Sequence, residues 1–109
     1  MLSQQLQVFL QVADCGSFTK AAKRLLVTPA SVMKHINTLE SRLGVTLFKR
    51  DKKGVVLTAA GRSLYQDGKK MAALANHAAA RAKRAEQEEG IVILVGSSLL
   101  NPSKVLTDL

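Results

Sequence analysis

Cysteine, aromatic residues and acidic charge are all scarce in this sequence of 109 residues. Because Cys15 is the only cysteine, no disulfide can form within the chain and no thiolate metal cluster is available. The continuous aliphatic run at residues 91–95 is far too short to span a bilayer. The N-terminus lacks the basic segment and the cleavage pattern of a signal peptide. Together these absences predict a cytoplasmic protein that does not enter a membrane.

Residue patterns typical of catalysis are missing as well. The sequence has no Ser/His/Asp or Cys/His arrangement, no glycine-rich phosphate loop, no paired acidic residues in a plausible cleft and no cluster of metal ligands. We therefore expect that the protein is not an enzyme, and that this segment holds no catalytic residue, no metal and no cofactor.

Basic side chains are abundant: 16 lysines and arginines stand against 8 acidic residues, which gives a formal charge of +8 and a pI near 10.1. Such a balance favours a polyanionic partner. Charge alone would also fit an RNA-binding protein, a protein of the membrane surface, or a basic surface without a function. The length allows one small domain and an appendage.

The stretch 17–43 predicts two helices joined by a tight turn. Thr28 can cap the second helix with its side-chain oxygen, and Pro29 suits a first helical position, where no N–H is needed. Apolar residues recur at helical spacing on one face of each helix: Phe18, Ala21, Ala22 and Leu25 on the first, and Val32, Ile36, Leu39 and Leu43 on the second. This pattern is typical of a helix-turn-helix, whose second helix is presented to the major groove of DNA.

Helical periodicity also marks residues 3–15, with Ser3 as N-cap and Gly16 as a left-handed stop, and this helix would complete a three-helix core. Residues 47–50 and 55–57 predict two short strands around the turn 51–54, which form a wing. The predicted wing tip carries Arg50, Lys52 and Lys53; a solvated hairpin without a function is the alternative. The fold class is thus mainly α: a winged helix-turn-helix over residues 1–57, with three helices and a β-hairpin, followed by a long dimerisation helix.

At these positions the chain resembles the LysR-type transcriptional regulators, over residues 2–89. The motifs stand in the order of that family: FL and VA at 9–13, GSFTKAA at 16–22, LVTPASV at 26–32, Ile36 with LE at 39–40, LGV with LF and Arg50 at 43–50, and LTAAG at 57–61. The resemblance implies the winged helix-turn-helix of a bacterial transcriptional regulator, which binds double-stranded DNA sequence-specifically.

The candidate DNA-binding residues lie on the helix-turn-helix and the wing. Lys34 can donate to guanine or to a phosphate, and Asn37 can pair with adenine or hold a phosphate. The family often has Gln at the position of Pro29 and Ser at that of Met33. Pro29 cannot hydrogen-bond a base edge, and Met33 offers only apolar contact, for example to a thymine methyl group. The full set is Ser17, Thr19, Lys20, Thr28, Pro29, Ala30, Met33, Lys34, Asn37, Thr38, Arg50, Lys52 and Lys53.

No proline occurs from Thr58 to residue 89 and helix formers dominate, so one long helix with Thr58 as N-cap is expected over 58–89. Mostly small side chains recur along it as a heptad seam: Leu64, Gly68, Met71, Ala75, Ala78, Ala82 and Ala85. The resemblance implies the family's linker helix, which pairs with its symmetry mate in a homodimer. A helix packed within its own domain is the alternative.

The apolar run at 91–95 is typical of a strand buried in a parallel sheet, and Asn101 with Pro102 predicts the start of another helix. One strand and a helix stub cannot form a sheet. The resemblance implies that residues 90–109 begin a truncated α/β effector-binding domain, and a small-molecule effector is expected for the missing part.

Two other binding functions stay open. A winged-helix protein that binds nucleic acid without sequence preference, for compaction or on RNA, would show a steep salt dependence and no preferred site. A pure dimerisation element would explain the long helix, but it leaves the basic wing and Lys34 without a role.

Overall fold

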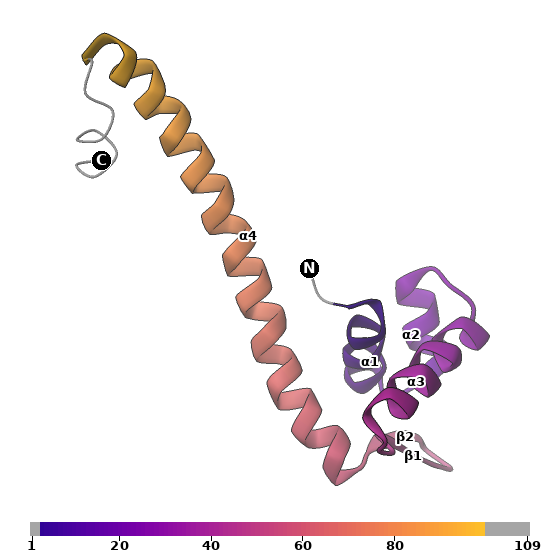
Figure 1. The fold of residues 1–109 in the computed structure, drawn as a ribbon. Helices are drawn as coiled ribbons and strands as arrows, with labels where there is room; N and C mark the ends of the chain where they lie inside the picture. The colour runs from indigo at the N-terminus through magenta and orange to yellow at the C-terminus, as the bar shows by residue number, and fades with distance from the viewer. Residues whose placement is uncertain (1–2, 100–109) are drawn as a thin grey trace. The chain divides into compact units, whose positions relative to one another are not determined.

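The computed structural model describes the backbone of residues 3–99 and the side chains of residues 3–88. These residues form α1 (Gln4–Cys15), α2 (Phe18–Leu25), α3 (Pro29–Leu43), β1 (Phe48–Asp51), β2 (Gly54–Leu57) and α4 (Ala59–Leu99) (Figure 1). The predicted fold class is confirmed: a mainly helical winged helix-turn-helix is followed by a long helix. The chain divides into two units, residues 1–73 and 74–109, and α4 continues from the first into the second.

Each of these helices begins after a serine or threonine whose hydroxyl caps it. The hydroxyl oxygen accepts a hydrogen bond from the backbone N–H of the third helical residue, at 2.9–3.2 Å. The predicted caps Ser3, Thr28 and Thr58 are confirmed. Ser17, predicted only as a DNA contact, caps α2.

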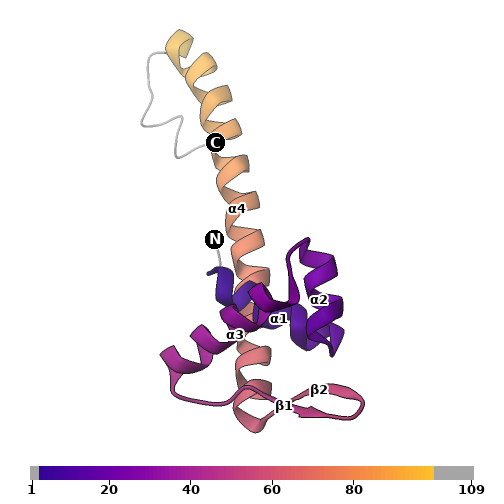
Figure 2. The same ribbon diagram turned by 90° about the vertical axis from the view of Figure 1, so that its right-hand side faces the viewer.

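The core of the first unit lies where α1, α2 and α3 meet, with the hairpin beside them (Figure 1, Figure 2). The largest fully buried side chains come from α1, from α3 and from the residue before β1: Phe9, Val12, Val32 and Leu47. Phe48 of β1 packs its ring against Phe9, with ring centroids 5.2 Å apart. The wing is therefore attached to the core by an aromatic contact.

The inner face of α3 is shorter than predicted. Val32, Ile36 and Leu39 are buried as expected, but Leu43 is 49% exposed and its predicted place in the core is wrong. The helix ends at Leu43, because Gly44 takes a left-handed conformation with φ +71°, and the chain turns away there towards β1.

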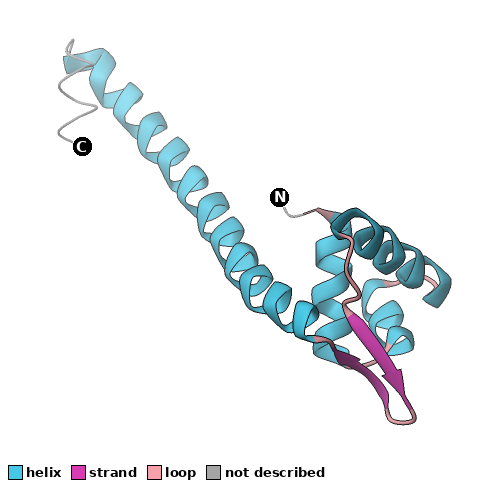
Figure 3. Cartoon of the chain, turned by 60° about the horizontal axis from the view of Figure 1, so that its bottom comes forward, coloured by secondary structure: helices cyan, strands magenta, loops and turns pink. Residues whose placement is uncertain are grey.

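β1 and β2 form an antiparallel hairpin (Figure 3). Its two-residue turn is Lys52–Lys53, with Asp51 opposite Gly54. Gly54 has φ +139°, and a Cβ atom there would lie 2.6 Å from the carbonyl oxygen of Gly16. That carbonyl accepts a hydrogen bond from the N–H of Val55 at 3.1 Å, so the hairpin lies directly on the end of α1. The prediction that the wing tip carries Arg50 is wrong, since Arg50 lies within β1, opposite Val55.

Two polar contacts fix the segment between α3 and the hairpin. The Glu40 carboxylate accepts a hydrogen bond from the N–H of Leu47 at 2.7 Å, and the Thr58 hydroxyl donates to the carbonyl of Thr46 at 2.6 Å. Sequence reasoning noted Glu40 only as part of a motif. The contact shows why a carboxylate at that position matters: it ties the end of α3 to the start of the wing.

The first turns of α4 pack on the three-helix core. Leu64 and Tyr65 are half-buried against it. Gly68 is buried, and a Cβ atom there would lie 2.9 Å from Cδ2 of Leu10 and 3.5 Å from Cδ1 of Leu6. Leu64 and Gly68, both predicted in the dimer seam, therefore have packing partners within their own chain.

A polar cluster joins α1 to α4. The Tyr65 hydroxyl donates to Oδ1 of Asp14 at 2.5 Å, and the Lys69 ammonium donates to Oδ2 at 3.1 Å. Burial raises the pKa of the Asp14 carboxyl, but the two hydrogen bonds and the charge of Lys69 outweigh it and hold the pKa below its usual value. The bond to Asp14 raises the pKa of both Tyr65 and Lys69. The ionised form of Asp14 thus favours this attachment of α4.

The predicted strand at 91–95 is wrong, because α4 continues as a helix through these residues and ends at Leu99. A helix satisfies its backbone hydrogen bonds within the segment, whereas a strand needs a neighbour, and β1 and β2 are the only strands in residues 3–99. The predicted helix start at Asn101 lies outside the described residues. Within the described chain, no helix is both long and apolar enough to cross a bilayer.

Candidate nucleic-acid interface

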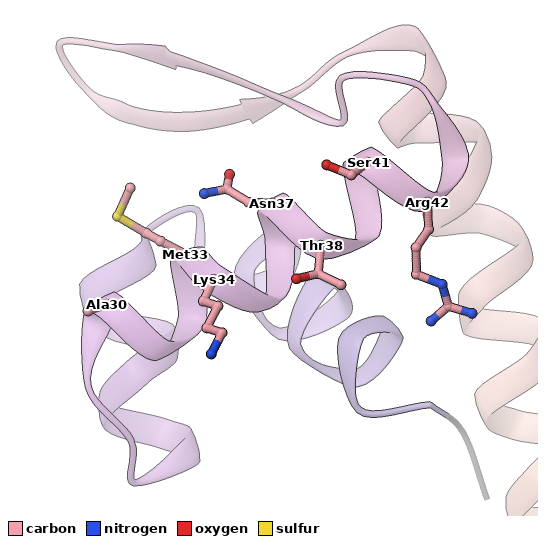
Figure 4. Close-up of a pocket in the computed structure, with 7 residues that line it drawn as sticks. All are labelled: Ala30, Met33, Lys34, Asn37, Thr38, Ser41 and Arg42. Atoms are coloured by element: carbon pink, nitrogen blue, oxygen red, sulfur yellow. The ribbon is translucent and has the colours of Figure 1, made fainter.

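The outward face of α3 forms an open groove, which we call the α3 groove (Figure 4). The lining side chains project from α3 in two adjacent rows. Within each row the residues are four positions apart, a separation that makes them neighbours on the helix surface. One row holds positions 30, 34, 38 and 42, and the other holds 33, 37 and 41. The lining residues are Ala30, Met33, Lys34, Asn37, Thr38, Ser41 and Arg42.

Part of the predicted DNA-binding interface lies in this groove. Five of the predicted DNA-binding residues line it: Ala30, Met33, Lys34, Asn37 and Thr38. The prediction did not include Ser41 or Arg42, which extend the two rows by one further turn. Extending the four-residue spacing beyond Thr38 would have found Arg42.

The chemistry of the groove is mixed along its length. Lys34 and Arg42 supply positive charge, and Asn37 supplies both donors and an acceptor. Ala30 and Met33 are apolar and lie towards the N-terminal end of α3. None of the seven lining residues is acidic, so the groove suits an anionic surface that carries both hydrogen-bonding and apolar groups.

The start of α3 is exposed and polar. Thr28 and Pro29 are both exposed, and the Thr28 hydroxyl oxygen accepts from the N–H of Ser31 at 3.1 Å. The same hydroxyl can still donate its proton to an outside acceptor. Pro29 occupies the first helical position and contributes no donor, so this helix start is less rich in N–H groups than most.

Arg50 reaches from β1 towards the helices. Its Nη2 donates to the sulfur of Met33 at 3.7 Å, and its guanidinium lies over the Phe18 ring, 5.0 Å from the centroid. Phe18 in turn meets Phe48 edge-on, with centroids 6.0 Å apart. Arg50 therefore connects the wing to the first turn of α2 and to the α3 groove.

A second pocket lies between the end of α1, the start of α2 and the hairpin. Three predicted DNA-binding residues line it together with the hairpin backbone: Ser17, Lys20 and Lys53. Thr19 and Lys52 are exposed but do not line it. Among the described side chains, no three His, Cys, Asp or Glu residues come together as metal ligands would.

Residues 3–62 match the family described as "Bacterial regulatory helix-turn-helix protein, lysR family". The chain belongs to the LysR family. The resemblance read from the motifs is therefore confirmed.

Relatives of this LysR-family chain carry the names of transcriptional regulators. The HTH-type transcriptional regulator TcbR of Pseudomonas sp. (strain P51) is 37% identical over 82 residues, which cover 75% of this chain and 28% of TcbR. The Hca operon transcriptional activator HcaR of Escherichia coli (strain K12) is 38% identical over 86 residues, 79% of this chain and 29% of HcaR. The chain thus spans less than a third of the length of these two relatives.

Solved structures of the family have the same fold. CbnR, a LysR family transcriptional regulator, superimposes with a TM-score of 0.76 at 35% identity, over 82% of this chain and 31% of CbnR. The CbnR DBD–DNA complex gives a TM-score of 0.73 at 36% identity, over 79% of this chain and 99% of that one. The BenM DBD in complex with catB site 1 DNA also gives 0.73, at 31% identity, over 77% of this chain and 93% of that one.

Proposed function

We propose that this chain is the sequence-specific, double-stranded DNA-binding part of a LysR-type bacterial transcriptional regulator. The observation that carries the proposal is the α3 groove. Two rows of side chains that can contact base edges lie there on the exposed face of α3, while the opposite face of the helix packs in the core. The similar CbnR and BenM domains, solved in complexes with DNA, support it. The function is binding, not catalysis, in keeping with relatives named as regulators.

The α3 groove is the part that reads bases. Lys34 donates to guanine O6 and N7, and Asn37 pairs with adenine; both side chains are exposed on adjacent rows. Ala30 and Thr38 flank them. Pro29 supplies an apolar surface at the entry of the helix. The preference of the protein for particular bases therefore depends on few polar side chains, chiefly Lys34 and Asn37.

Phosphate contacts surround this groove and set its register on the duplex. The hydroxyls of Ser17, Thr19 and Thr28 and the cations of Lys20, Lys52 and Lys53 are the groups in reach of the backbone. Arg50 adds positive charge between them. These contacts carry affinity and its salt dependence, not sequence preference.

The linker helix α4 joins two copies into a homodimer. Because Leu64 and Gly68 pack within the chain, the intermolecular seam is Met71, Ala75, Ala78, Ala82 and Ala85, which keep the heptad spacing. Leu74, next to the seam, is 60% exposed and Met71 is 41% exposed, as expected of apolar residues that a partner covers. A dimer places two α3 helices on an inverted repeat.

The remainder of the regulator lies outside the DNA-binding part. We infer that an α/β effector-binding domain that takes a small molecule belongs to the same regulator, and that the regulator works in the cytoplasm without a membrane partner. The proportion of TcbR that the chain covers, 28%, is consistent with this division.

Selection from a randomised duplex library at near-physiological salt tests the proposal. The bound pool should contain an inverted repeat with a fixed gap. A matched pair of variants separates base reading from charge: Lys34→Ala should flatten the preference at one position, whereas Lys52→Ala should weaken binding to all sequences alike. A pool that stays random while the protein still binds would contradict sequence specificity and favour a nonspecific nucleic-acid-binding winged helix.

A further inference from the structure

Met33 occupies a position in the α3 groove where a polar side chain would be able to hydrogen-bond to a base. It is partly buried and stands in the same row as Asn37, one turn nearer the start of the helix (Figure 4). A thioether has neither a strong donor nor a strong acceptor. Its contribution to recognition must therefore be apolar.

The side chain of Met33 is held by a neighbour. Methionine has three rotatable bonds and usually adapts its shape. Here the sulfur accepts a hydrogen bond from Nη2 of Arg50 at 3.7 Å. Arg50 is itself fixed by stacking on Phe18, whose ring rests on Phe48 of the core. The sulfur is thus anchored through a series of contacts that reaches the interior, and the terminal methyl group has few positions left.

The major groove of DNA offers one apolar group on its base edges, the 5-methyl group of thymine. We propose that Met33 reads a thymine by methyl-to-methyl contact, and that Arg50 is a positioning residue that aims it. This inference rests on the proposed DNA-binding function. It gives Arg50 a role distinct from phosphate binding, because the guanidinium faces the Met33 sulfur and an aromatic ring.

The test compares thymine with uracil, which has the same hydrogen-bonding groups and lacks the methyl. Two randomised duplex libraries, one made with thymine and one with uracil, are selected in parallel on the 109-residue chain. The thymine library should enrich T at one position in each half-site, and that preference should be lost from the uracil library. Replacing that single T by U in the enriched duplex should weaken binding about fourfold, the value of one buried methyl group.

Variants assign the effect to the two residues. Met33→Ser should bind the T and U duplexes equally, while Met33→Leu should retain part of the difference. Arg50→Lys keeps the charge but loses the planar stack, so it should reduce the T-to-U ratio and leave the salt dependence unchanged; circular dichroism checks that each variant is folded. Were Arg50 only a phosphate contact, Arg50→Lys would leave the ratio as it was.

Two outcomes overturn the inference. Equal binding of T and U duplexes at every position by the unchanged protein excludes methyl reading, and a T-to-U ratio that survives Met33→Ser assigns it to another residue. Both leave the proposed function standing, since a preferred site still exists. Pools that stay random in both libraries contradict the proposed function itself, and the inference with it.

Discussion

Leu26 has a left-handed backbone, with φ +58°, and is the one non-glycine residue with positive φ in the described part of the chain. It ends α2 in the turn before α3, and its side chain is 91% exposed. A left-handed conformation costs an L-residue about 1–2 kcal/mol, which the exposed side chain does not recover through packing. The turn between the two helices is therefore strained.

Relief of this strain should stabilise the protein. Leu26→Gly should raise the free energy of unfolding by about 0.5–1 kcal/mol, because the strain removed exceeds the added entropy of glycine in the unfolded chain. Thermal unfolding measures the change. Arg24→Gly, two residues earlier and within α2, should lower stability by about 1 kcal/mol. A lower melting temperature for Leu26→Gly would show that the turn is not strained.

Asp14 makes the attachment of α4 dependent on pH. Because its pKa is lowered in the folded state, the carboxylate stabilises the protein above the unfolded pKa near 3.8, and this contribution is lost as pH falls through the folded pKa. Asp14→Asn should lower the melting temperature by about 2 °C at pH 7, and the difference should shrink and then vanish as the solution is acidified through the lowered folded pKa of Asp14.

Asp67→Asn is the matched control for Asp14→Asn, since Asp67 is an exposed carboxylate on the same helix as Lys69 and Tyr65. It should leave the melting temperature unchanged at pH 7 and in acid. A difference for Asp14→Asn that persists in acid would mean that the substitution acts through packing and not through the charge.

At the scale of elements, the parts that depend on local sequence agree with prediction. The caps Ser3, Thr28 and Thr58 and the left-handed Gly16 were predictable, because each needs only its neighbours within a few residues. Leu43 and the run 91–95 were not. Leu43 has an apolar helical position yet is half exposed, and residues 91–95 have the pattern of a strand yet form a helix. Tertiary structure decides both outcomes, and periodicity does not encode it.

Gly68 gives the clearest case of an ambiguous pattern. A small residue at a heptad position fits a close approach of two helices, and the sequence does not say whether the second helix is a symmetry mate or α1. The structure has Leu10 against it. In the candidate site, the contact of Arg50 with Met33 was equally hidden, since the residues are 17 positions apart and neither type predicts the other.

The dimerisation of α4 can be tested by one substitution on the seam. Ala78→Glu places a carboxylate where two helices approach, so it should shift the protein towards monomer. Ala80→Glu adds the same charge at an exposed position on the face opposite the seam and should leave the dimer intact. Light scattering gives the mass of each. An unchanged dimer mass for Ala78→Glu would refute the seam.

At the scale of the whole molecule, the proposed function assigns separate roles to the charge of +8 and to the α3 groove. The charge is carried by side chains such as Lys20, Lys52 and Lys53 and provides affinity for any polyanion. This affinity weakens as the salt concentration rises. The groove provides discrimination among sequences, which salt changes little. The two contributions add in binding, but they respond differently to salt.

The most direct measurement is therefore the affinity for the selected inverted repeat and for a scrambled duplex of the same composition, at several salt concentrations. We predict that both affinities fall with salt along similar slopes, while the selected duplex remains about a thousandfold or more tighter throughout. Two curves that coincide at every salt concentration would contradict the account, because the protein would then bind phosphate alone.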